Sequence, residues 1–153
     1  SGRLNAYGAV LVSNSQGKEG VTDMVEFNKK NAEETIRAGA EHATKDQLEE
    51  VLRKQREIED KFKGKGPLGK FIADVKLLFS LVNDYAKGNY KEIPWWSIAA
   101  VVTALLYVLS PVDAIPDWIP VIGYVDDAMV VGVCLALIEN DLQAYKAWKL
   151  NNS

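Results

Sequence analysis

Residues 109–127 read LSPVDAIPDWIPVIGYVDD, and no other part of the 153-residue chain is as rich in residues that fix the backbone. The stretch holds three prolines, one glycine and four aspartates, and it separates two strongly apolar segments. Proline fixes its own φ and restricts the residue before it, so the chain must turn here more than once. We therefore expect this stretch, named the corner below, to join the two helices of a hairpin.

The segments on either side of the corner predict the two hairpin helices. Residues 93–112 carry no charge, and Pro94 can begin a helix over about 95–109. The second helix is expected over about 124–149, apolar in its first half and amphipathic in its second. Residues 67–87 show the most regular amphipathic pattern of the chain, which predicts a helix that packs on the hairpin.

The chain before residue 64 is more polar. Residues 22–63 combine a thin apolar stripe with many charges, which predicts a charged helical hairpin or arm. Within it, Thr44 and Gln47 have the spacing of a capping box that begins a second helix. Residues 1–21 predict a flexible N-terminal arm, or an extended segment laid on the helices, and its β-like run YGAVLV has no plausible partner strand.

Together these patterns predict an all-α fold, a small helical bundle built round a hydrophobic hairpin. Residues 64–150 are expected to form the main helical domain. The composition, 48% hydrophobic and 25% charged, is typical of a globular protein. The 16 Lys and Arg of residues 1–92 nearly balance 15 Asp and Glu, whereas residues 93–153 hold 2 and 6. A net charge of −3 argues against nucleic-acid binding, which needs a basic face.

Two features that suggest chemistry have simpler interpretations. Gly64, Gly69 and Lys70 have the spacing of a nucleotide-binding P-loop, but Phe71 stands where the motif needs Ser or Thr, and a charged helix precedes it instead of a strand. We therefore expect no nucleotide. The single cysteine, Cys134, lies in an apolar run and is expected to be buried, and the single histidine, His42, lies at a predicted helix end.

The residues of the corner resemble the YkvA family, a bacterial domain of unknown function. Its hallmark is an ordered motif between two hydrophobic helices, which reads here as Ser110-Pro111-Val112-Asp113-Ala114-Ile115-Pro116-Asp117-Trp118-Ile119-Pro120, then Gly123-Tyr124 and Asp126-Asp127. The resemblance covers about residues 95–138. It implies a helical hairpin often described as membrane-associated, and it implies no known reaction.

The four aspartates of the corner allow three interpretations. Asp113, Asp117, Asp126 and Asp127 supply hard oxygen ligands, which suit a divalent cation such as magnesium, calcium or manganese. The favoured alternative is that each carboxylate caps a turn or a helix end. A metal-dependent hydrolase is the third interpretation, but no nucleophile or base accompanies the carboxylates, so an enzyme is less expected than a non-catalytic protein.

Two architectures remain open at this stage. In the first, the chain is a compact helical interaction or scaffold module whose helical faces bind a protein partner or a second copy, with a membrane surface as a further partner. In the second, residues 93–112 and about 118–138 insert into a membrane as a hairpin, with Trp95 and Trp96 at one edge. We expect a cytoplasmic protein, or one at or in the inner membrane, in which case the cations near the two termini favour cytoplasmic ends.

Overall fold

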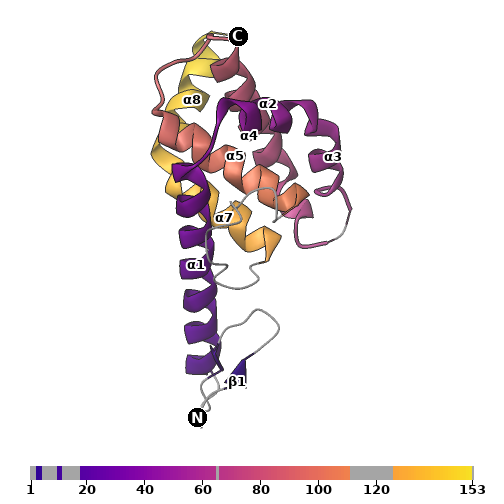
Figure 1. Ribbon diagram of the computed structural model, residues 1–153, viewed down its shortest axis with the longest axis vertical. Coiled ribbons are helices and arrows are strands. Elements are labelled where there is room, and N and C mark those ends of the chain that lie inside the picture. Colours follow the sequence, from indigo (N-terminus) through magenta and orange to yellow (C-terminus); the bar gives the residue numbers. More distant parts are fainter. Residues whose placement is uncertain (1–2, 5–9, 12–17, 65, 111–125, 153) are drawn as a thin grey trace.

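The computed structural model describes residues 3–4, 10–11, 18–64, 66–110 and 126–152, with side chains for Glu26 and from Asn28 onwards (Figure 1). Over these ranges the protein is almost entirely helical, which confirms the all-α prediction. The helices are α1 (Lys18–Glu41), α2 (Lys45–Arg53), α3 (Gln55–Asp60), α4 (Ile72–Ala86), α5 (Trp95–Leu109), α7 (Asp127–Leu137) and α8 (Glu139–Asn151).

Helix α5 is the centre of the bundle. It begins after Pro94, whose extended backbone forms the N-cap, and it ends at Leu109, as predicted. Every residue from Ser97 to Val108 is buried, so no face of this helix is left to solvent. Helices α1, α2, α3, α4 and α7 all contact it (Figure 1). A helix that is apolar all round requires such an enclosure.

Helix α1 covers α5 and α7 from one side, and its N-terminal half extends beyond the bundle (Figure 1). It begins at Lys18, earlier than the predicted start at residue 22. The expectation that the β-like run has no partner was wrong. Strands β1 (Arg3–Leu4) and β2 (Val10–Leu11) pair antiparallel, and β2 contacts α1.

The segment between α1 and α4 follows the predicted order with different helix boundaries. Thr44 and Gln47 form the predicted capping box, with both reciprocal hydrogen bonds present. The predicted single helix to about residue 63 is interrupted at Lys54 and ends at Asp60.

The helix predicted over 67–87 begins later than expected. A 3-10 turn, η1 (Gly69–Phe71), comes first, and α4 begins at Ile72. A Cβ atom at Gly69 would lie 2.5 Å from the carbonyl oxygen of Gly64, so only glycine allows this close approach of the backbone. At the other end, α4 ends at Ala86, close to the predicted end at residue 87, and Gly88 follows with a φ of +79°.

The helix predicted over 124–149 is two helices. Asp126 is the N-cap of α7, and a bend of 72° at Ile138 separates α7 from α8. The bend coincides with the change from apolar to amphipathic sequence. It turns the buried Leu142 and Tyr145 of α8 toward the core, where Tyr145 reaches α4.

The buried face of α1 carries polar side chains that the sequence pattern did not single out. Asn28, Asn31 and Thr35 are each less than a tenth exposed. Within the part of the chain that the structure describes, Oδ1 of Asn28 and Nδ2 of Asn31 are buried and have no hydrogen-bond partner. An unsatisfied buried polar group costs about 1–3 kcal/mol, so these asparagines weaken the packing of α1.

Replacing Asn31 by leucine is therefore expected to raise the free energy of unfolding by about 1 kcal/mol, because the substitution removes a desolvated amide and adds apolar contact. Chemical denaturation followed by circular dichroism measures the change. Asn140→Leu is the matched control, since Asn140 is exposed on α8 and the same gain in helix propensity occurs without burial. Equal effects of the two substitutions would show that the burial of Asn31 carries no cost.

Candidate functional site

Lys61 joins the two ends of the corner. Its ammonium Nζ donates to the carbonyl oxygen of Leu109, the last residue of α5, at 3.3 Å. A cation at this position also suits the negative end of the α5 dipole. At the start of α7 the pKa of Asp127 lies above its ordinary value, mainly because the carboxyl is partly buried. The positive charge of Lys61 lowers this pKa, and the negative charge of Asp126 raises it further. The charged arm thus places one cation between the helix end that leads into the corner and the carboxylates that follow it.

The structure describes two of the four predicted site residues, and both lie at the start of α7. The Asp126 carboxylate accepts a hydrogen bond from the backbone N–H of Ala128 at 3.2 Å, and Asp127 is the first residue of α7. Asp113 and Asp117 lie outside the described residues. Within the described ranges, no three His, Cys, Asp or Glu side chains are grouped as metal ligands. The divalent-cation site therefore stays a prediction.

Replacing Asp126 by alanine is expected to lower the free energy of unfolding by about 1 kcal/mol, because the first turn of α7 loses its side-chain acceptor. Asp126→Asn is the control, since its amide oxygen can accept the same hydrogen bond. Thermal denaturation of the three proteins measures the difference. If Asp126→Ala unfolds at the wild-type temperature, the cap has no role in stability.

A groove lies between α1, η1 and α7. Its volume is about 840 Å³, and its floor is apolar. The floor comes from one face of α7, with residues Met129, Gly132, Val133, Ala136 and Leu137. Phe71 forms part of the wall beside them, since a Cβ atom at Gly132 would lie 3.7 Å from the ring carbon Cζ of Phe71.

The rim of the groove is charged. Lys29, Lys30, Glu26 and Glu33 of α1 line one side, and Lys70 of η1 lies on the other. All three lysine side chains are exposed. An apolar floor with charged groups along the rim is typical of a ligand site, because the floor buries carbon while the rim selects charge.

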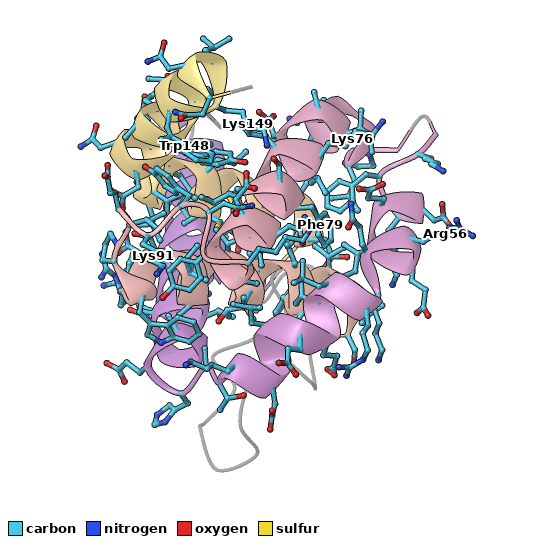
Figure 2. The ribbon with its side chains drawn as sticks, turned by 90° about the horizontal axis from the view of Figure 1, so that it is seen from above. Arg56, Lys76, Phe79, Lys91, Trp148 and Lys149 are labelled. Atoms are coloured by element: carbon cyan, nitrogen blue, oxygen red, sulfur yellow. The ribbon has the colours of Figure 1, made fainter. Side chains whose placement is uncertain are left out.

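A second polar cluster joins α4 to α8. Asp84 Oδ2 accepts hydrogen bonds from the Tyr145 hydroxyl at 2.5 Å and from Lys149 Nζ at 3.0 Å, while Oδ1 accepts from Asn89 at 3.2 Å. Ser80 hydrogen-bonds the same Tyr145 hydroxyl. Figure 2 shows Lys149 and its neighbour Trp148 on the side of α8 that faces α4. We name these groups the Asp84 cluster.

Electrostatics fix the charge state of the Asp84 cluster. Burial alone would raise the pKa of Asp84, but hydrogen bonds from Tyr145, Lys149 and Asn89 together hold this pKa below its ordinary value. The hydrogen bond to Asp84 raises the pKa of Lys149. Burial, followed by the bond to Asp84, raises the pKa of Tyr145. Asp84 is therefore an ionised carboxylate whose partners are protonated. This arrangement stabilises the contact between α4 and α8.

Aromatic rings pack against the same cluster. The rings of Tyr90 and Tyr145 meet edge to face with centroids 5.2 Å apart, and Trp148 lies 4.9 Å from Tyr90. Ser97, near the start of α5, donates a hydrogen bond of 2.5 Å to Asp141 of α8. The start of α5 and the end of α4 are thus both fixed to α8 by contacts between residues distant in the sequence.

The cysteine prediction is confirmed. Cys134 is buried, its thiol contacts the carbonyl oxygen of Ala100 on α5 at 3.7 Å, and burial raises its pKa to about 12. A thiol in this state is a packing group, since the nucleophilic thiolate is suppressed. The position of His42 also agrees with prediction, because it follows directly after Glu41, the last residue of α1.

Comparison with known proteins identifies the family. The uncharacterised membrane protein YkvA of Bacillus subtilis (strain 168) is 33% identical over 81 residues, which are 53% of this chain and 76% of that relative. This chain belongs to the YkvA family. A profile of the protein family of unknown function DUF1232 matches residues 97–133. No solved structure matches the chain.

The residues matched by the DUF1232 profile have a clear place in the fold. They run from Ser97 in α5 to Val133 in α7, so they span the buried helix, the corner and the start of the groove floor. Among the described residues no single helix is both long and apolar enough to cross a membrane. Helices α7 and α8 pass that test of length and composition only as a bent pair.

Proposed function

We propose that this YkvA-family protein is a non-catalytic helical interaction module that associates with a membrane as a folded bundle. Its hydrophobic hairpin is the core of that bundle, and the contacts with the membrane and with other proteins come from outer helical faces. The family relative named a membrane protein supports the association. We place both termini on the cytoplasmic side, because nearly all cations of the chain precede residue 93.

The observation that carries this proposal is the enclosure of α5. A hairpin that spans a bilayer would turn apolar side chains of α5 toward lipid, whereas Ser97 to Val108 are buried on all sides by protein. At 1.5 Å per residue, a helix of 15 residues is about 22 Å long, short of the roughly 30 Å of a hydrocarbon core. Exposing α5 to lipid would also require α1, which packs on both α5 and α7, to leave the bundle.

Extraction of membranes from cells that express the natural protein tests this proposal. We expect alkaline carbonate to release the protein without detergent, because it lies on the membrane and does not span it. Recovery of the whole protein in the soluble fraction after gentle lysis would show that it does not associate with membranes. Retention through the carbonate wash, with release only by detergent, would favour a spanning hairpin.

A further inference from the structure

The floor of the groove is an apolar face of α7 that the described residues cover only in part. Met129, Gly132, Val133, Ala136 and Leu137 recur at the three- and four-residue spacing that places them along one side of α7. Only Val133 is buried, and Ala136 is exposed. An apolar stripe that remains accessible in the folded protein is typical of a surface that binds another molecule.

The rim carries three lysines whose ammonium groups are not held in ion pairs by the described residues. Lys29, Lys30 and Lys70 form no ion pair with any carboxylate that the structure describes. Lys70 lies over the wall of the groove, with its Nζ 5.1 Å from the ring centre of Phe71. The three ammonium groups are thus available to a ligand at the edge of an apolar channel.

The acidic residues of the same rim are largely in use. The Glu33 carboxylate lies 3.6 Å from the guanidinium of Arg37, and that of Asp126 caps α7. With Arg37 counted, four cations stand against the carboxylates of Glu26, Glu33 and Asp126, which leaves the rim a net charge of about +1. The electrostatic field at the rim therefore favours an anionic group of a ligand, while the apolar floor favours a hydrocarbon chain.

We propose that this groove binds an anionic phospholipid, with the phosphate near Lys29, Lys30 and Lys70 and an acyl chain along the α7 floor. The volume of about 840 Å³ lies within the roughly 300–1,000 Å³ of pockets for organic ligands, so the groove can hold part of such a molecule. Lysine ammonium groups bind phosphate as point charges and need no planar geometry. The inference rests on the proposed membrane association, and it assigns that association to one surface and one class of lipid.

Vesicle flotation with the full chain tests the charged half of the site. The wild-type protein is expected to float with vesicles of equal parts phosphatidylcholine and phosphatidylglycerol, and far less with phosphatidylcholine alone. The triple variant K29Q/K30Q/K70Q should bind the mixed vesicles roughly a hundredfold more weakly, since each lysine near an anionic surface strengthens binding about fivefold. The control K45Q/K76Q/K91Q makes the same change of charge at lysines outside the groove and should lose much less.

Gly132→Leu tests the apolar half. Leucine favours helix over glycine, and a Cβ atom here meets only Phe71 at an ordinary distance, so the variant should fold, which a circular dichroism melt checks. The leucine side chain would occupy space on the floor that the acyl chain needs. If about two methylene groups of the acyl chain then stay in water, binding to the mixed vesicles should fall roughly tenfold.

The outcomes separate the two proposals. If the wild-type protein floats with neither vesicle, the membrane association itself is wrong. The wild-type protein could float while the K29Q/K30Q/K70Q variant and its control bind equally, or while Gly132→Leu binds like the wild type. Either result would keep the membrane association and show that the groove is not the lipid site. If the wild type is a dimer in solution that Gly132→Leu dissociates, the groove holds a second copy of the chain and the lipid assignment is overturned.

Discussion

Leu105→Ala is expected to lower the free energy of unfolding by about 3 kcal/mol, the largest loss for any single substitution considered. Leu105 is fully buried at the centre of α5, and truncation there removes apolar contacts and leaves a cavity that surrounding helices cannot fill. For a chain of this length the midpoint of thermal unfolding should fall by about 6–12 °C. Thermal and chemical denaturation in detergent-free buffer measure both quantities.

Leu150→Ala is the matched control, because Leu150 is 82% exposed at the end of α8. The same substitution there should change the free energy of unfolding by less than about 0.5 kcal/mol. A small effect of Leu105→Ala, comparable to that of the control, would contradict the position of α5 in the core.

Asp84→Ala is expected to lower the free energy of unfolding by about 2–3 kcal/mol. The substitution removes the acceptor for Tyr145 and Lys149 and breaks the link between α4 and α8. Tyr145 is fully buried, so its hydroxyl keeps only Ser80 as a partner. The Lys149 side chain is 46% exposed and can return to water, so Lys149→Met should lose less than about 1 kcal/mol.

The effect of Asp84 should depend on pH in a defined direction. Because its folded pKa lies below the ordinary value of 3.8, the carboxylate stabilises the folded state fully above that value, and this contribution disappears as the pH falls through the folded pKa. The difference in stability between wild type and Asp84→Ala should therefore shrink in acid. Asp60→Ala, at an exposed residue paired with Lys63, is the control and should show little effect at any pH. A difference that stays constant into strong acid would contradict an ionised Asp84.

Local sequence signals predicted the parts of the fold that depend on neighbouring residues. Pro94 gave the start of α5, Thr44 and Gln47 gave the start of α2, and Gly88 gave the end of α4, because each acts on the backbone within one helical turn. The capping of α7 by Asp126 was predictable for the same reason. The family followed from the ordered residues of the corner, and the relative that matches this chain confirms it.

Contacts between distant residues were not predictable in the same way. The Asp84 cluster joins residues 61 and 65 positions apart in the sequence, and the bend at Ile138 that brings them together has no proline or glycine to mark it. One signal was available, since Asp84 falls three residues after the buried Leu81 on the apolar side of α4. A carboxylate in that position needs a buried partner, but the sequence does not say which one.

The groove was missed because neither wall is unusual alone. The charges of α1 have the spacing of an ordinary solvated helix face, and the stripe on α7 has the composition of a core helix. Only the packing of α1 beside α7 brings these faces together across about a hundred residues of sequence. Asn28 and Asn31 of α1 are also buried, and no local pattern indicates their burial.

The most direct test of the central claim is to label the membrane-bound protein with a lipid-soluble, photoactivated carbene reagent and to map the labelled residues by mass spectrometry. If the hairpin is enclosed by the bundle, residues 97–108 of α5 should carry no label, and label should appear on the groove face of α7 at Met129 or Leu137. Labelling within residues 97–108 of protein that remains bound to the membrane would contradict the account, because it would show α5 in contact with lipid.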